Sequence, residues 1–529
     1  MTTTHTRAPT TSSSPSRQAR RRAILHEAGG YALAAVLALV VTAQLATTQA
    51  WMMFADGDSL ITVLLTKSLV AGHAQDWAMS PVLFIPETAV YAALSTLGLG
   101  VRATLMLNAW VNFVALYAAI RVVSGSRRRV SHPVRGALLA FSAFCLLAVL
   151  NSGEGRDGFH LASAFGLTTY YSATVVGVIL TSGITRRVLD RAPSSRRIPV
   201  LALTGITLAS AVSTLTNPLF AAWGTVPLVV VLLLLRAGGI SAWRPVLFLA
   251  VATVAGTALG MAARVPLSPW IVADARLYVR AGHWAASFVR YAGLAVESAA
   301  SLPGAGFLLL TAAMWGISCA LTARFFRRGM TAPAFVTGSA ALVPVVVVIG
   351  MVTLGTDGIR YLQPVAFMPP LALVTIPTLR RQEERNLDSP RKWWRAGAIG
   401  MAAIVALGWS LPRAISEARA TDVDLACVVD WVDSSDRVGA GQFWTVRAPQ
   451  AYARDPASLI QVDHQFAVYE WLTNRADSAS PRVTFVITDG MSSPFEYPDG
   501  VSESDASTLS CGRYTIHDFG DRRIPITHR

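Results

Sequence analysis

Two aspartates, Asp56 and Asp58, stand two residues apart in the stretch FADGDSL, directly after an apolar run long enough to cross a membrane. A carboxylate can accept the proton of an attacking hydroxyl group, and a pair of carboxylates can hold a divalent cation. Because an aspartate with its ordinary pKa of about 3.9 is a weak base at neutral pH, burial or the second carboxylate must raise that pKa. Asp58 alone could instead cap a helix formed by the following SLITVLLTKSL.

An arginine and two further acidic residues occur in later polar segments that separate apolar runs. Arg360, followed by Tyr361 in TDGIRYLQP, can bind a phosphate through a bidentate fork, or can be a helix-end arginine at the membrane surface. Glu154 and Asp157 in NSGEGRDGFH are candidates for substrate binding or for a cation site, the alternative being solvated loop acids. We predict one site that combines these residues with the two aspartates.

The stretch GHAQDWAMS adds His73, Asp76 and Trp77, which we predict at the mouth of this site as substrate-binding residues. The indole of Trp77 can stack on a sugar face, because an aromatic ring offers a large apolar surface. Anchoring of Trp77 at the membrane–water interface is the alternative.

The elements that position these residues must be membrane helices. The chain has 529 residues, of which 53% are hydrophobic and only 14% charged, and its apolar residues form long blocks, as is typical of a polytopic membrane protein. The net charge of +14 comes from arginines in short clusters between the blocks. The positive-inside rule explains such clusters as cytoplasmic loops, so we expect no nucleic-acid partner.

The arginine clusters also predict the orientation in the cell membrane. If all of them are cytoplasmic, together with a disordered basic tail at 1–28, about eleven spans are required and the C-terminus lies outside. These spans are expected near residues 30–50, 103–123, 136–151, 160–183, 198–215, 219–235, 245–263, 305–323, 333–353, 360–379 and 396–412.

The first apolar run and the stretch after it each allow more than one arrangement. A cleaved signal peptide is the alternative for the run at 30–50. A span between Pro81 and Gly100 would place the next arginine cluster outside, so we predict that this stretch lies along the outer membrane surface. Residues 51–101 then form a first external loop with interfacial helices, within a transmembrane domain at 29–412.

Residues 413–529 have the composition of a soluble domain, predicted to be extracytoplasmic and of α/β or α+β class. Strands are expected at QFWTVR, SLIQV, RVTFVITD and RYTIHDF, and helices at DVDLACVVDWVDSS and FAVYEWLTN. Cys427 and Cys511 both fall here, where an oxidising exterior permits a disulfide, two free thiols being the alternative. Trp444, Arg447 and Tyr452 could contact carbohydrate, although core packing also explains the aromatic residues.

The arrangement resembles the GT-C superfamily of polytopic glycosyltransferases, which includes oligosaccharyltransferase catalytic subunits, protein O-mannosyltransferases and aminoarabinose transferases. The features that carry the resemblance are the acidic ADGDSL in the first external loop, GEGRD in the second, the GIRYLQP segment at an outer helix mouth and the C-terminal domain. FADGDSL, DWAMSPVLFIPE and GAGQFWTVR further resemble an actinobacterial branch of such transferases.

The resemblance implies a mostly α-helical membrane bundle that transfers a sugar, a hexose or a pentose, from a polyprenyl-phosphate-linked donor on the outer face of the membrane. The acceptor would be an envelope glycan, lipid or protein, and membrane lipids would surround the bundle. Either Asp56 or Asp58 would be the catalytic carboxylate. A divalent cation, Mg or Mn, is possible at these residues with Glu154 and Asp157, but no cofactor is certain.

Two other classes of protein share some of these features. A polysaccharide polymerase or flippase would also have many spans, although a flippase should carry polar residues within several of them, whereas this chain concentrates its ionisable groups at their ends. A non-catalytic membrane scaffold would tolerate the loss of Asp56, Asp58 and Arg360.

Overall fold

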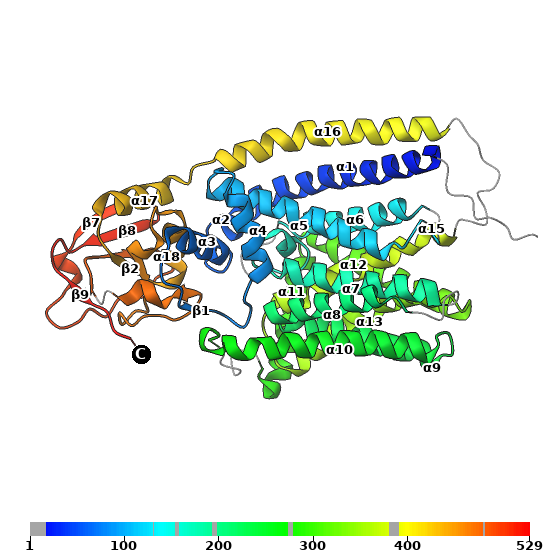
Figure 1. Ribbon diagram of the computed structural model, residues 1–529. Helices are drawn as coiled ribbons and strands as arrows, with labels where there is room; N and C mark the ends of the chain where they lie inside the picture. The colour runs from blue at the N-terminus through cyan, green and yellow to red at the C-terminus, as the bar shows by residue number, and fades with distance from the viewer. Residues whose placement is uncertain are drawn as a thin grey trace, which may run out of the picture.

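The computed structural model describes residues 17–127, 129–130, 132–153, 158–192, 198–272, 279–379, 391–479 and 482–528. These residues form a bundle of long helices and a smaller, strand-containing C-terminal domain at one end of the bundle (Figure 1). The long helices of the bundle are α1 (Arg17–Thr48), α5 (Val101–Val123), α6 (Pro133–Leu150), α7 (Ser172–Arg191), α8 (Val200–Thr216), α9 (Val226–Ala237), α10 (Trp243–Arg264), α12 (Leu302–Arg327), α13 (Thr331–Thr353) and α16 (Arg391–Arg419).

Within the described ranges, seven helices are long and apolar enough to cross a membrane, namely α1, α5, α6, α7, α10, α12 and α13. The protein is therefore a multi-pass membrane protein. The predicted count of about eleven spans stays a prediction. Helix α8 has 17 residues, and the apolar helix Ala221–Ala237, of which α9 is the larger part, has the same length. At 1.5 Å per residue each is about 26 Å long, less than the roughly 30 Å of a hydrocarbon core.

Two predicted spans differ from the observed helices. The segment at 360–379 is not one helix but a succession of short ones: η7 (Ile359–Leu362), α14 (Pro364–Phe367), η8 (Pro369–Thr375) and α15 (Ile376–Leu379). Its prolines explain the breaks, because proline lacks the N–H that a continuous helix requires. The span predicted at 160–183 begins only at Ser172, after the 3-10 helix η1 (Ser163–Gly166).

The first external loop contains three short helices, α2 (Ala50–Phe54), α3 (Ile61–Ala71) and α4 (Ile85–Ser95), and the short strand β1 (Trp77–Ala78). Helix α4 has 11 residues, about 16 Å, and so cannot cross the membrane. This agrees with the prediction that the stretch between Pro81 and Gly100 does not form a span.

The prediction of a disordered tail at 1–28 is wrong for its second half, because α1 already begins at Arg17. RQARRRAILHE is rich in residues of high helix propensity, and its last residue is held in place. The carboxylate of Glu27 pairs with Arg121 at 2.5 Å and with Arg127 at 2.9 Å. Residues 1–16 lie outside the described ranges.

Helix α16 lies along α1 and leads into the C-terminal domain (Figure 1). This domain is built on a five-stranded mixed sheet of order β3-β2-β6-β8-β7, formed by β2 (Gly439–Gly441), β3 (Leu459–Gln461), β6 (Phe485–Thr488), β7 (Ser507–Cys511) and β8 (Tyr514–Asp518). Strand β2 is parallel to β3 and β6, whereas β8 is antiparallel to β6 and β7. Two helices, α17 (Val423–Ser435) and α18 (Phe443–Tyr452), complete the α/β domain.

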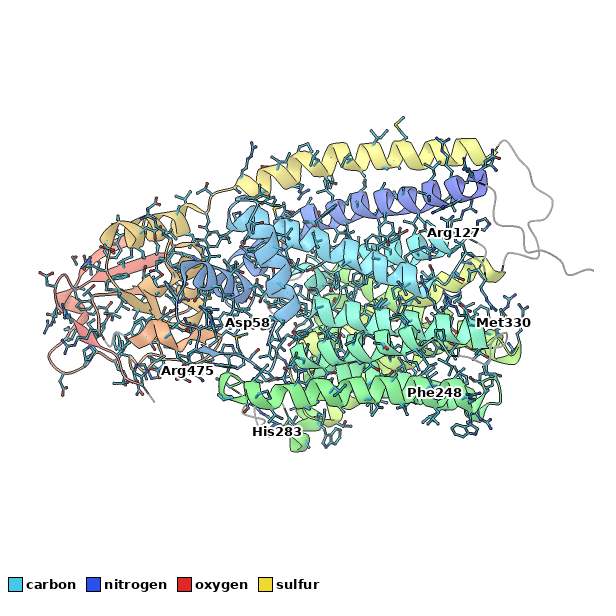
Figure 2. The ribbon with its side chains drawn as sticks, in the orientation of Figure 1. Asp58, Arg127, Phe248, His283, Met330 and Arg475 are labelled. Atoms are coloured by element: carbon cyan, nitrogen blue, oxygen red, sulfur yellow. A yellow bond between two sulfur atoms is a disulfide. The ribbon has the colours of Figure 1, made fainter. Side chains whose placement is uncertain are left out.

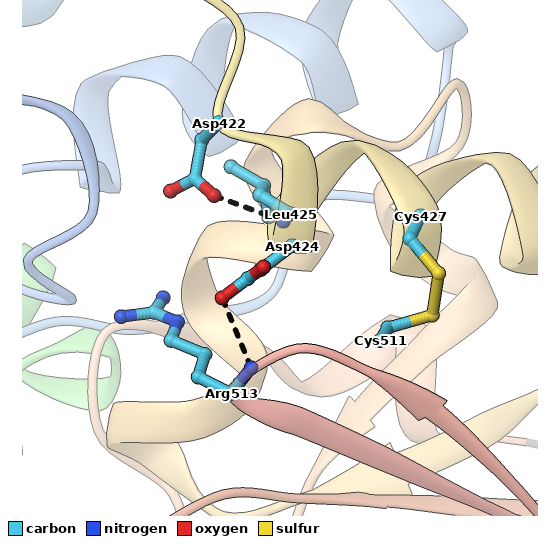
Figure 3. The surroundings of a disulfide bond; sticks show 6 residues. All are labelled: Asp422, Asp424, Leu425, Cys427, Cys511 and Arg513. Carbon is cyan, nitrogen blue, oxygen red and sulfur yellow. Dashed lines mark hydrogen bonds between the residues drawn. A yellow bond between two sulfur atoms is a disulfide. The ribbon is translucent and has the colours of Figure 1, made fainter.

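A disulfide joins Cys427 of α17 to Cys511 of β7, the two cysteines that the sequence predicts to pair (Figure 3). Nearby, one hydrogen bond caps the start of α17 and another joins the helix to the strands. The carboxylate of Asp422 accepts from the backbone N–H of Leu425, and that of Asp424 accepts from the backbone N–H of Arg513. The start of α17 is thus anchored to the β7–β8 hairpin.

Two local predictions in this domain are wrong. QFWTVR forms the start of α18, in which Phe443 and every residue from 445 to 451 are buried. A helix buried on nearly all sides carries no polar–apolar period that distinguishes it from a strand. FAVYEWLTN is mostly irregular and ends in the short strand β4 (Thr473–Asn474). Strand β4 pairs with β1, Trp77 opposite Asn474, and so joins the C-terminal domain to the first external loop.

Candidate active site

The aspartate pair lies in the turn between α2 and α3, and the two carboxylates have different surroundings. Asp56 is 3% exposed, and its Oδ2 accepts hydrogen bonds from the backbone N–H of Ser59 at 3.0 Å and from its hydroxyl at 3.1 Å. The capping role considered for Asp58 is wrong, because α3 has Leu60 as its N-cap residue and no side-chain cap. Asp56 stabilises the turn, which leaves Asp58 free for another contact.

Asp58 forms an ion pair with Arg360. Nη1 of Arg360 donates to Oδ2 of Asp58 at 3.0 Å, and Oδ1 of Asp58 is buried without a hydrogen-bond partner in the described structure. The guanidinium also lies within 6.0 Å of the ring centroids of Tyr170 and Tyr171, at the entrance to α7. Residues 302 positions apart are thus brought together, and a cation and a carboxylate face the same space.

Burial and the charge of Asp58 raise the pKa of Asp56 to about 7. The hydrogen bonds from Ser59 and the positive charge of Arg360 oppose this rise but do not cancel it. The hydroxyl of Tyr170 also donates to Asp56 Oδ2, at 3.4 Å. Asp56 therefore exchanges its proton near neutral pH, as a carboxylate that influences acid–base chemistry should.

A cavity of about 410 Å³ opens beside the ion pair. Its polar wall includes Asp58, Arg360 and Asn217, and most of the remaining wall is apolar. Two residues of the C-terminal domain, Trp471 and Leu472, also line it. Figure 2 shows Asp58 at the junction of the helix bundle and this domain. Such a cavity can hold an anionic group against the guanidinium with an apolar portion alongside.

The structure brings together four of the predicted site residues: Asp56, Asp58, Arg360 and Tyr361. Tyr361 lines the cavity beside Arg360, and its backbone carbonyl accepts a hydrogen bond from the indole of Trp223 at 3.1 Å. Two other predicted residues, Glu154 and Asp157, lie outside the described ranges.

The three residues predicted at the mouth of the site are instead contacts with the C-terminal domain. His73 lies 3.6 Å from Asp455 and 3.7 Å from Asp477, and Asp76 pairs with Arg475 at 3.3 Å. Trp77 is 7% exposed in β1, so its faces are covered. The polar residues of GHAQDWAMS serve these contacts with the C-terminal domain. No local sequence pattern reveals such contacts, because the partner residues lie about 400 positions further along the chain.

Sequence reasoning considered Arg447 for carbohydrate contact, but the structure places it behind the aspartate turn. Its side chain is fully buried, and a Cβ atom added to Gly57 would lie 3.2 Å from its Cγ. Nη1 donates to Gln450 at 3.2 Å, whereas Nε and Nη2 have no hydrogen-bond partner in the described structure. Burial lowers the pKa of Arg447 to about 9, while the charges of Asp58 and Asp56 oppose this.

The other two residues of that carbohydrate-contact hypothesis also lie away from the cavity beside Asp58. Trp444 is 39% exposed and packs on Phe443, and Tyr452 lines a separate cavity near the end of α16. The cavity residues that sequence reasoning missed are Tyr171, Asn217 and Trp471. The adjacent tyrosines before α7, Tyr170 and Tyr171, are a weak sequence signal for a binding site. The sequence around Asn217 and around Trp471 contains no such signal.

A metal site is not evident in the described part of the chain, where no group of three or more His, Cys, Asp or Glu side chains is placed to hold an ion. One oxygen of Asp58 is already engaged by Arg360. The remaining candidates for a cation site, Glu154 and Asp157, are not described. A divalent cation at the aspartate pair therefore stays a prediction.

The protein has the GT-C fold of membrane glycosyltransferases. This fold combines the helix bundle, the helices of the first external loop and a C-terminal α/β domain next to the cavity. One solved structure that the chain matches is ArnT from Cupriavidus metallidurans, crystallised in complex with undecaprenyl phosphate. The TM-score is 0.52 at 13% sequence identity, covering 95% of this chain and 99% of that one. At this identity the match establishes the fold.

A second solved structure is the oligosaccharyltransferase of Archaeoglobus fulgidus in complex with Zn and sulfate. It matches at a TM-score of 0.45 and 11% identity over 86% of this chain and 68% of that one, too weak a likeness to support an argument. No protein-family model matches the chain, and no curated protein matches its sequence. The resemblance to an actinobacterial branch therefore stays a prediction.

Proposed function

We propose that the protein is a membrane glycosyltransferase that moves a sugar, a hexose or a pentose, from a polyprenyl-phosphate donor to an acceptor of the cell envelope. The observation that carries the proposal is the cavity in which the Asp58–Arg360 ion pair faces a largely apolar wall. A phosphate fits the guanidinium, and an isoprenoid chain fits apolar surface. The shared fold supports this assignment, since ArnT was crystallised with undecaprenyl phosphate.

In the proposed reaction, an acceptor hydroxyl attacks the anomeric carbon of the donor sugar. The new C–O bond forms as the bond between the sugar and the phosphate breaks, and the phosphate leaves with the electron pair. Asp58 takes the hydroxyl proton, because it is the aspartate of the pair that lines the cavity. Arg360 stabilises the departing phosphate with N–H groups that Asp58 does not engage.

Asp56 acts on this step through Asp58. Burial and the charge of Asp58 raise the pKa of Asp56 to about 7, so the charge beside the catalytic carboxylate changes near neutral pH. The hydrogen bonds between Asp56 and Ser59 also fix the turn that presents Asp58. We therefore assign Asp58 as the catalytic residue and Asp56 as a positioning residue.

The proposed site faces the outside of the cell membrane, with the N-terminus cytoplasmic. At the opposite end of the bundle lies a basic region that includes Arg121, Arg127 and Arg186, which suits the cytoplasmic side (Figure 2). The disulfide of the C-terminal domain suits the oxidising exterior. The acceptor, an envelope glycan, lipid or protein, would approach from that side.

The test is transfer of radiolabelled sugar from polyprenyl-phosphate donors in membranes that contain the wild-type chain or single variants at equal expression. Asp58→Asn is expected to lower the rate by about 10²–10⁴-fold, and Arg360→Ala by a comparable factor. Arg437→Ala is the control, because Arg437 pairs with Asp518 in the C-terminal domain and lies outside the site. Undiminished transfer in Asp58→Asn and Arg360→Ala would refute the assignment and favour a transporter or a scaffold.

A further inference from the structure

The cavity beside Asp58 contains polar groups that the ion pair and a donor phosphate leave unused. Asn217 is fully buried, and its side-chain amide nitrogen has no hydrogen-bond partner in the described structure. The hydroxyl of Thr169, 4% exposed, is also unpartnered among the described residues. Buried polar groups without partners are unfavourable, so both side chains favour a ligand that carries hydroxyl groups.

The aromatic residues of the cavity wall differ in how much of their rings they present. Tyr171, Tyr361 and Phe84 are at most 9% exposed, so their rings are largely covered by other side chains. Trp471 lines the same cavity and is only half-buried. A half-buried tryptophan beside unpartnered polar groups is the combination that suits a sugar ring, with its apolar C–H face and its hydroxyl edge.

The backbone around Trp471 is held in an unusual conformation. The next residue, Leu472, has a φ of 52°, in the left-handed region that is strained for a non-glycine residue. Two sets of hydrogen bonds maintain it. The side-chain amide of Gln461 donates to the carbonyls of Tyr469 and Trp471 at 2.7 and 3.0 Å, and β4, which follows at once, pairs with β1. The C-terminal domain thus fixes Trp471 against the membrane domain.

We propose that Trp471, together with Asn217 and Thr169, forms the subsite for the donor sugar, so that the C-terminal domain supplies the stacking residue that determines sugar specificity. This inference rests on the proposed function and adds the residues that recognise the transferred group. It assigns to Trp471 the stacking role that the sequence suggested for Trp77, whose faces are covered in β1.

The test compares lipid binding to the full-length protein in nanodiscs, by native mass spectrometry. The probes are undecaprenyl phosphate without a sugar and undecaprenyl phosphate that carries mannose, glucose or arabinose. Wild type is expected to bind at least one sugar-bearing lipid more tightly than the bare lipid. Trp471→Ala should weaken that binding about tenfold and leave binding of the bare lipid unchanged, and Trp471→Phe should retain most of it.

Tyr497→Ala is the matched control, an aromatic residue of the same domain that packs on Phe466 and Phe519 away from the cavity. It should leave both affinities unchanged. Equal weakening of the bare and sugar-bearing lipids by Trp471→Ala, or a wild type that does not distinguish them, would overturn the sugar subsite while the phosphate site stands. A bare lipid whose binding does not depend on Arg360 would instead overturn the proposed function.

Discussion

Replacement of Asp56 by Asn is predicted to stabilise the protein above pH 7 and to have almost no effect near pH 4. Asparagine has nearly the same shape and keeps an oxygen that can accept the hydrogen bonds of Ser59. The substitution removes the negative charge of Asp56, a residue that is 3% exposed and lies beside Asp58. The variant thus isolates the free energy of ionising Asp56 in the folded protein.

The magnitude follows from the pKa of Asp56, which is about 7 in the fold against an ordinary value of 3.8. Because the folded pKa is the higher one, the folded protein keeps the proton that the unfolded chain releases, and the wild type loses stability as pH rises between these values. At about 1.4 kcal/mol per pKa unit, the loss is on the order of 1.5 kcal/mol at pH 5 and 4 kcal/mol above pH 7. Asp56→Asn does not incur this loss.

The assay is the melting temperature of purified wild type and Asp56→Asn in the same detergent, measured from pH 4 to pH 8.5 by intrinsic fluorescence. The difference in favour of the variant should grow between pH 4 and pH 7 and then remain constant. Asp518→Asn is a control of opposite sign, because hydrogen bonds from Arg437 lower the pKa of Asp518. Asp518→Asn should have a lower melting temperature than wild type at neutral pH, and the difference in melting temperature should shrink as the pH falls.

Two results would refute the reasoning. An Asp56→Asn variant less stable than wild type at pH 8 would show that the ionised carboxylate is favoured in the fold. A stability gain that does not change with pH would show that it has another origin. In the transfer assay, wild-type activity should rise with pH around a midpoint near 7, and this rise should be absent in Asp56→Asn.

Further predictions concern the C-terminal domain. The double variant Cys427→Ser/Cys511→Ser lacks the disulfide and should be less stable in this domain, by up to about 4–5 kcal/mol in the chain-entropy model. A reductant should lower the melting temperature of wild type and leave the melting temperature of the double variant unchanged. Arg447→Met removes a buried cation beside the aspartate turn, so the pKa of Asp56 should rise further. The pH midpoint of the transfer activity should then move upward. Arg447→Lys keeps the charge and should keep a midpoint close to that of wild type.

The sequence by itself determined the broad architecture, because membrane insertion depends on local composition. Long apolar blocks bounded by arginines predicted the helices of the bundle. The positive-inside rule predicted that the stretch between Pro81 and Gly100 does not form a span, and its helix α4 has only 11 residues. The strands at SLIQV, RVTFVITD and RYTIHDF also followed from local patterns. Local composition failed at QFWTVR, whose aromatic and β-branched residues favour a strand although the segment begins a helix that is buried on nearly all sides.

The candidate site was only partly predictable, because its residues come from distant parts of the chain. FADGDSL and GIRYLQP each carry a chemical signal, so Asp56, Asp58 and Arg360 could be selected from the sequence. Their roles could not, because the turn bonded to Ser59 and the ion pair with Arg360 are tertiary facts. The assignment of Trp77 to the site was wrong for the same reason, since its partner strand lies in the C-terminal domain.

What only the tertiary structure decided is which surfaces the C-terminal domain covers and which it leaves open. It covers Trp77, presents Trp471 to the cavity and places the cation of Arg447 behind the aspartate turn. Burial and the relative positions of charges depend on how the whole chain packs, and the pKa of Asp56 depends on both. The sequence therefore indicated the candidate carboxylates, whereas the fold determined the pKa of Asp56 and placed Asp58 in the cavity wall.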